Sequence, residues 1–143
     1  VDELNAAIGL ARSAGDQPLL EKIQNWLFDL GSSLACPPDG KFELAGPSAD
    51  SIKALEESID TMEVDLAPLK NFILPGGCEL AARLHLSRCI CRRAERSVQR
   101  LASSEAVPSE SCVFLNRLSD WLFVAARAAN ARDGRPDVPW TKS

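Results

Sequence analysis

Residues 79–101 read ELAARLHLSRCICRRAERSVQRL and carry an apolar pattern and a cationic one together. Small or apolar side chains recur in this segment every three or four residues, at Leu80, Leu84, Ser87, Cys91, Ala94, Val98 and Leu101. This spacing places them on one face of an α-helix. The segment therefore predicts a long amphipathic helix with one buried side.

The same spacing extends over most of the remaining chain and predicts four further helices, over residues 1–14, 17–34, 48–69 and 111–132. No segment shows the alternation of polar and apolar residues that is typical of a β-strand. Sustained heptad spacing favours the shallow packing angles of an antiparallel bundle. The predicted fold is therefore all-α, an antiparallel five-helix bundle over residues 1–133, followed by a loose C-terminal tail over residues 134–143.

The composition is typical of one globular domain, with 143 residues, 45% of them hydrophobic and 25% charged, and a net charge of −4. The acidic total argues against a protein that binds nucleic acid through overall positive charge. No apolar run approaches the length of a membrane span. Five cysteines without a repeated spacing argue against a zinc site and favour a reducing compartment. The single histidine, His85, is expected to be a hydrogen-bonded structural residue rather than a catalyst.

The cationic pattern lies on the same predicted helix. Residues 83–100 contain six arginines and one carboxylate, Glu95, which gives a local net charge of +5. Arg88, Arg92 and Arg96 are four residues apart and form a column along one face. Because three guanidinium groups in a column repel each other, we expect negatively charged groups to lie beside them. Two interpretations remain open: a solvated face paired with carboxylates of a neighbouring helix or subunit, or a site for a polyphosphate.

Two other segments carry candidate binding residues. Residues 72–77 read FILPGG, an apolar stretch whose glycines allow the backbone to approach a ligand closely. A tight turn between helices explains the same stretch equally well. Asn116 lies beside the expected core residue Leu115, where its amide can hydrogen-bond a ligand or a structural partner.

Four segments together resemble the PduO-type ATP:cob(I)alamin adenosyltransferases: VDELN at residues 1–5, FILPGG at 72–77, CRRAER at 91–96 and LNRLSDWLF at 115–123. They occur in the order of that family, and the combination of the last two is highly specific. The resemblance implies a five-helix bundle that assembles as a homotrimer with active sites between subunits. It also implies transfer of the 5′-deoxyadenosyl group of ATP to cob(I)alamin or another reduced corrinoid, forming adenosylcobalamin and releasing triphosphate.

The resemblance also assigns roles to individual residues. The implied ATP site consists of Arg92, Arg93, Glu95, Arg96 and Asn116. Arg92 and Glu95 are implied to be catalytic together with Phe72, the family's aromatic wedge on the cobalamin side, which displaces the lower axial base. Arg88 is implied to pair with Asp2 across the subunit boundary. Mg²⁺ is expected to enter with ATP, and no side chain of the protein is expected to bind a metal.

The resemblance carries further expectations. The family's Thr/Gly/Asp-rich phosphate-binding segment, of the T-x-T-G-D-x-G type, is absent before residue 1, so the chain is expected to trimerise but to bind ATP weakly. The expected partners are ATP, the corrinoid, a reductase and an adenosylcobalamin-dependent mutase, without nucleic acid or a membrane. The expected location is the cytoplasm, or the mitochondrial matrix in a eukaryote. The alternative function is a non-catalytic helical trimer that binds or delivers a corrinoid or a nucleotide.

Overall fold

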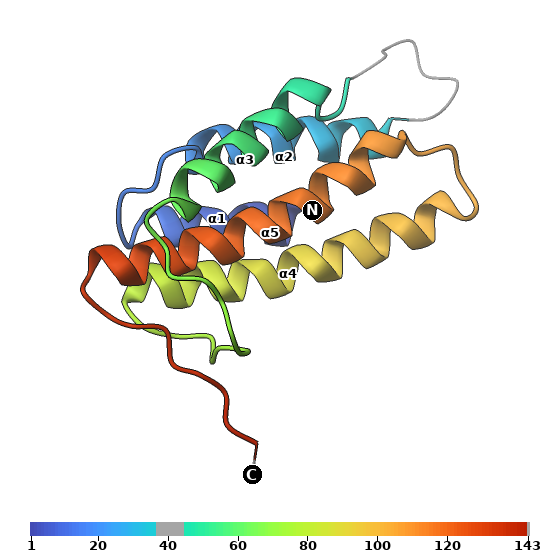
Figure 1. Cartoon of the computed structure of the whole chain (residues 1–143). Coiled ribbons are helices and arrows are strands. Elements are labelled where there is room, and N and C mark those ends of the chain that lie inside the picture. The colour runs from blue at the N-terminus through green and yellow to red at the C-terminus, as the bar shows by residue number, and fades with distance from the viewer. Residues whose placement is uncertain (37–44, 143) are drawn as a thin grey trace.

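The computed structural model describes residues 1–36 and 45–142, and within these ranges it consists of helices without a strand (Figure 1). The five helices are α1 (Asp2–Arg12), α2 (Leu20–Ala35), α3 (Ala49–Glu63), α4 (Glu79–Ala102) and α5 (Ser109–Arg132). The predicted all-α bundle of five helices is therefore confirmed. Most of the connection between α2 and α3, residues 37–44, lies outside the described residues.

Two helices differ by three or more residues from their predicted bounds, each near a proline. α3 ends at Glu63, although the apolar spacing predicts a helix that continues to residue 69. Pro68 explains why the helix does not reach residue 69, because proline lacks a backbone N–H and disfavours helical backbone in the residue before it. α2 begins at Leu20, three residues later than predicted, and Leu19 before it has a left-handed backbone with a φ of 76°.

The core is built around α5, which packs against both α4 and α3, while α1 packs against α4 and α2. Figure 1 shows α4 and α5 running antiparallel beside each other. Trp121 of α5 is completely buried, and its Nε1 donates to Ser58 Oγ of α3 at 2.9 Å, so the largest core side chain has a partner for its polar atom. The other helices contribute further fully buried side chains, among them Leu4, Ile8, Ile23, Leu27, Leu30, Leu55 and Leu84. None of the described helices combines the length and the hydropathy needed to cross a bilayer.

The turn before α4 is tied to the end of α5 by one side chain. Asn130 Nδ2 donates to the carbonyl of Gly76 at 3.0 Å, and Asn130 Oδ1 accepts from the amide of Cys78 at 2.9 Å. Gly77 lies between these two bonds with a φ of +111°, and a Cβ at this position would lie 1.9 Å from Asn130 Oδ1. Both the backbone conformation and the space therefore require glycine here.

The C-terminal tail is attached to the bundle rather than loose as predicted. The amide of Leu74 donates to the carbonyl of Val138 at 2.8 Å, and the amide of Trp140 donates to the carbonyl of Phe72 at 2.7 Å. Together they form a short antiparallel bridge centred on Ile73. The tail and the segment before α4 are far apart in the sequence, so a pattern of helical periodicity contains no signal for their pairing.

The two glycines of the turn before α4 provide a matched pair of variants. We expect Gly77→Ala to lower the free energy of unfolding by roughly 1–3 kcal/mol, because it strains the backbone and displaces Asn130. Gly76→Ala should be neutral or slightly stabilising, because nothing lies within 4 Å of the added methyl group. Urea unfolding of the two variants and the wild type measures the difference. Equal effects of the two substitutions would contradict this account of the turn.

Candidate functional site

The arginines of α4 fall into a paired and an unpaired group. Arg83 forms an ion pair with Glu79 on the same helix, and Arg93 forms one with Glu3 of α1. Arg92 and Arg96 are exposed and have no ion-pair or hydrogen-bond partner among the described residues.

The interpretation of the cationic helix as an ion-paired face thus accounts for part of the cluster only. Arg92 and Arg96 lie one turn apart and leave two guanidinium groups open to an anionic ligand.

Glu95, the carboxylate among these arginines, points into the bundle. Its side chain is buried and its Oε1 accepts from Asn116 Nδ2 of α5 at 3.0 Å and from Gln99 Nε2 at 3.4 Å. The structure thus brings two of the predicted site residues, Glu95 and Asn116, into direct contact. Asn116 keeps its carbonyl oxygen and a second N–H for other partners. Glu95 therefore fixes the orientation of an amide that lies at the surface beside the arginine column.

Arg88, the third member of the column, is half-buried over an aromatic ring. Its guanidinium carbon lies 6.0 Å from the centroid of Phe123, within the range of a cation–π contact. Its Nε is buried without a hydrogen-bond partner among the described residues. Asp2, its predicted partner, is exposed and forms no ion pair within the described part of this chain. Asp2 and Arg88 therefore do not pair with each other within the described part of this chain.

A hollow of about 490 Å³ lies beside the column, between α3, α4 and α5. Its lining includes Arg88, Arg92, Asp60, Glu63, Asp120 and Phe123. Carboxylates from α3 and α5 face the arginines of α4 across it, so the hollow has mixed charge. An anion is therefore favoured at the exposed guanidinium groups rather than deep in this hollow.

Phe72 lies in the segment before α4 with 83% of its side chain exposed. The bridge to the tail places Trp140, which is half-exposed, beside it. Leu74 and Val138 of the same bridge are half-exposed as well, so the bridge carries a cluster of uncovered apolar side chains. No described contact joins this cluster to Arg92 or Arg96. The structure therefore does not bring Phe72 together with the other predicted site residues in one chain.

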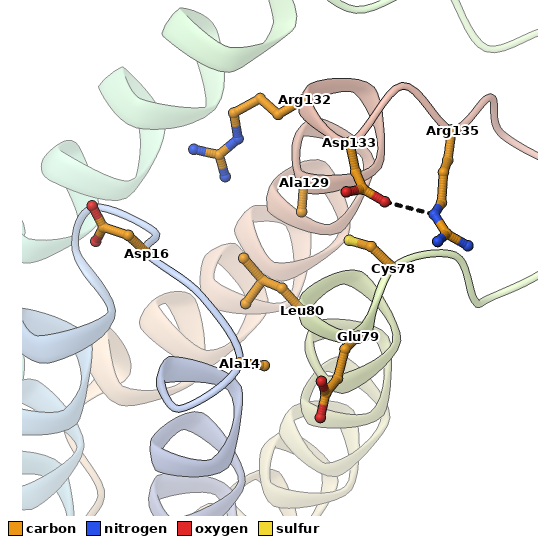
Figure 2. A pocket seen from close by; sticks show the side chains of 9 residues that line it. All are labelled: Ala14, Asp16, Cys78, Glu79, Leu80, Ala129, Arg132, Asp133 and Arg135. Carbon is orange, nitrogen blue, oxygen red and sulfur yellow. Dashed lines mark hydrogen bonds and ion pairs between the residues drawn. The ribbon is translucent and has the colours of Figure 1, made fainter.

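Another hollow, of about 530 Å³, lies at the end of the bundle where α4 begins and α5 ends (Figure 2). Arg135 pairs with Asp133 at 2.6 Å, and Arg132, whose guanidinium points toward the loop that carries Asp16, donates to Gln17. These arginines already have partners, in contrast to Arg92 and Arg96. The described residues also contain no group of three His, Cys, Asp or Glu side chains that could hold a metal ion.

Comparisons with known proteins identify the family of this chain. The sequence model of the cobalamin adenosyltransferases matches residues 1–129. This chain belongs to the cobalamin adenosyltransferase family.

Among the relatives of this cobalamin adenosyltransferase chain, the corrinoid adenosyltransferase of Bacillus subtilis is 43% identical over 152 residues, covering 100% of this chain and 77% of the relative. Corrinoid adenosyltransferase MMAB of Homo sapiens is 38% identical, covering 99% of this chain and 61% of the relative. The PduO-type ATP:corrinoid adenosyltransferase of Lactobacillus reuteri has been solved as a phenylalanine-to-alanine variant with cobalamin and ATP. It shares 39% identity and a TM-score of 0.93, over 99% of this chain and 82% of that one.

Sequence reasoning missed two features of this cobalamin adenosyltransferase chain. Trp140 was not recognised as a neighbour of Phe72, although a tryptophan directly after Pro139 is an unusual residue for a free tail. His85 is buried, and the prediction that it is hydrogen-bonded is wrong. Both of its ring nitrogens lack a partner among the described residues, and its ring stands edge-on to Phe123 at 6.1 Å between centroids.

The environments of two titratable side chains follow from burial. Burial lowers the pKa of His85, the positive charge of Arg88 lowers it further, and Asp137 opposes them. Burial raises the pKa of Cys91 to about 12, Glu95 adds to the shift, and the thiol donates to the carbonyl of Leu115 at 3.2 Å. Cys91 is therefore a protonated core residue at neutral pH rather than a nucleophile.

His85 predicts how the stability of the fold depends on pH. Its pKa in the folded chain is below its ordinary value of 6.5, so the unfolded chain binds the proton first as the pH falls. We expect the free energy of unfolding to decrease below pH 6.5, by at most about 1.4 kcal/mol per pH unit for one proton. Urea unfolding between pH 7.5 and 5.5 measures this decrease in the wild type and in His85→Gln. Because the chain has one histidine, the variant should show a flatter profile, and parallel profiles would contradict the assignment.

Proposed function

We propose that this chain transfers the 5′-deoxyadenosyl group of ATP to the cobalt of cob(I)alamin or another reduced corrinoid, and that the unpaired arginines of α4 bind the triphosphate. The reaction follows from membership of the family, so the chain is an ATP:corrinoid adenosyltransferase. The observation that supports the site is the exposed pair Arg92 and Arg96, whose side chains have no partner in the described part of the chain, beside the Glu95–Asn116 hydrogen bond.

The chemistry explains why such a site needs arginine rather than a protein nucleophile. The attacking group is the reduced cobalt of the substrate, and the triphosphate takes the bonding electrons of the C5′–O bond when it leaves. Guanidinium groups fixed on a helix stabilise the negative charge that grows on the leaving oxygens. Mg²⁺, entering on the phosphate oxygens of ATP, would neutralise part of the same charge.

The remaining predicted ATP residues would act around this pair. Asn116 would present its free amide groups to the nucleotide, because Glu95 holds it in one orientation. Arg93 would contribute through its charge, although its present partner is Glu3 of α1. Glu95 would act by placing Asn116, since its carboxylate is turned into the bundle.

The corrinoid side of the site is proposed at the apolar cluster around Phe72. A side chain that is 83% exposed on a folded surface is available to pack against a large apolar ring. When the corrin is bound, Phe72 would occupy its lower face and keep an axial ligand away from the cobalt. Trp140 would extend the same apolar surface.

The active sites are proposed to lie between the subunits of a homotrimer. Two features support this within residues 1–36 and 45–142: Arg88 Nε is buried without a partner, and Asp2 is an exposed carboxylate without one. An ion pair between subunits would satisfy both. A reductase that supplies the reduced corrinoid and an adenosylcobalamin-dependent mutase that uses the product are proposed as partners. The proposed location is the cytoplasm, or the mitochondrial matrix in a eukaryote.

Arg92→Ala tests the triphosphate site. With reduced cobalamin, ATP and Mg²⁺, we expect the rate of adenosylcobalamin formation to fall roughly 100-fold, as is typical when one charge-stabilising donor is removed. The absorption spectrum of the corrin measures formation of the cobalt–carbon bond, and thermal unfolding verifies that the fold is retained.

Arg100→Ala is the matched control for this measurement. Arg100 lies in the last turn of α4 and is exposed, and its side chain also has no partner among the described residues. It should keep wild-type activity, and normal turnover of Arg92→Ala would refute the site. A wild type that binds the corrinoid but never forms the cobalt–carbon bond would instead support the non-catalytic binding or delivery function.

A charge exchange tests the pair between subunits. Asp2→Arg and Arg88→Asp should each reduce the assembly below three times the 15.5-kDa chain mass, because each places like charges opposite each other. The double variant restores opposite charges and should recover the trimer at least in part. Sedimentation analysis measures the mass. Intact trimers in both single variants, or no recovery in the double variant, would refute the pairing.

A further inference from the structure

Arg127 of α5 is a buried arginine that the adenosyl transfer described above does not use. Only 5% of it is exposed, and its guanidinium group donates hydrogen bonds to two different segments. Nε donates to Asp137 Oδ2 of the tail at 2.7 Å, and Nη2 donates to the carbonyl of Ala67, between α3 and α4, at 2.7 Å. One side chain of the rigid helix thus holds two non-helical segments.

The same two segments meet again at the apolar cluster. Beyond Ala67 the chain reaches Phe72, and beyond Asp137 it reaches Trp140. The amide of Trp140 donates to the carbonyl of Phe72, and the amide of Leu74 donates to the carbonyl of Val138. The two segments are therefore joined twice, once through Arg127 of α5 and once through the Phe72–Trp140 bridge.

The space between the two segments is not filled by packed side chains. A hollow of about 580 Å³ lies there, bordered by residues of both segments and by Arg127. Where packing does not fix a segment, its hydrogen bonds and ion pairs determine its position. A lysine could not replace Arg127, because one ammonium group does not present the two divergent N–H donors of the guanidinium fork.

We propose that Arg127 and Asp137 are positioning residues for the corrinoid: they hold the Phe72 segment and the tail at the spacing that places Phe72 against the ring. This inference rests on the proposed role of Phe72. The pair makes no contact with Arg92, Arg96 or Asn116, so its loss should affect the corrinoid side of the reaction and leave the ATP side unchanged.

The test compares Asp137→Asn and Arg127→Lys with Asp133→Asn. Asp133→Asn is the matched control, because it removes an exposed ion pair with Arg135 from the same tail. Hydrogen exchange of the Leu74 and Trp140 amides reports the bridge without any substrate. We expect about tenfold faster exchange of these two amides in the first two variants. The Cys78 amide, which is bonded to Asn130, should exchange as in the wild type in all three.

Steady-state kinetics with each substrate varied in turn provide the second measurement. In Asp137→Asn and Arg127→Lys we expect the KM for the corrinoid to rise about tenfold, while the KM for ATP stays within about twofold. Asp133→Asn should change neither. A merely structural role would alter both constants together or lower the fraction of folded protein.

The outcomes separate this inference from the proposed function. Unchanged exchange and an unchanged corrinoid KM in Asp137→Asn, which preserves the size of the side chain, would overturn it. Faster exchange with an equal change in both KM values would overturn it as well. A wild type without adenosyl transfer would refute the proposed function, whereas the exchange measurement would still show whether Arg127 and Asp137 hold the bridge.

Discussion

The antiparallel packing of α4 against α5 is the contact on which the rest of the molecule depends. Three hydrogen bonds cross it at different heights: from the Cys91 thiol to the carbonyl of Leu115, from Asn116 to Glu95, and from the amide of Cys78 to Asn130. The first lies in the core, the second beside the arginine column and the third at the turn before α4. Any shift between the two helices would therefore disturb the core, the candidate nucleotide site and the approach to Phe72 together.

Helical periodicity was sufficient to predict the elements, because burial of one face is a local property of each segment. It failed where a local signal competed with it: Pro68 keeps α3 from extending to residue 69, although the apolar spacing continues that far. It also failed where the partner is distant in the sequence. In the sequence Glu95 is one more polar residue among arginines, whereas in the structure it is buried and accepts a hydrogen bond from Asn116, which belongs to another helix.

The residues of the candidate site were likewise predicted on different grounds. The charge pattern singled out Arg92 and Arg96, and neither side chain has a partner among the residues that the structure describes. The roles of Phe72, and of Asp2 with Arg88, came from the resemblance alone, since no spacing rule links these positions. The neighbourhood of Phe72 and Trp140 depends on a bridge between segments far apart in the chain, which no periodicity encodes.

The two sides of the proposed site are held in physically different ways. Arg92 and Arg96 lie in the middle of α4 and are exposed. Repulsion between two like charges one turn apart destabilises a helix by only about 0.2–0.5 kcal/mol, and water screens them. The fold tolerates this cost while the helix keeps both charges fixed, as stabilisation of a leaving triphosphate demands. Phe72 instead lies before the start of α4 at Glu79, which is about 20 Å along the helix axis from Arg92. Its segment is bonded across a hollow to Arg127 and the tail.

A charged leaving group needs donors that do not move, whereas a large apolar ring needs a surface that can adjust to it. The middle of α4 thus holds the two arginines rigidly, whereas the segment before α4, which carries Phe72, is positioned by a few hydrogen bonds and ion pairs.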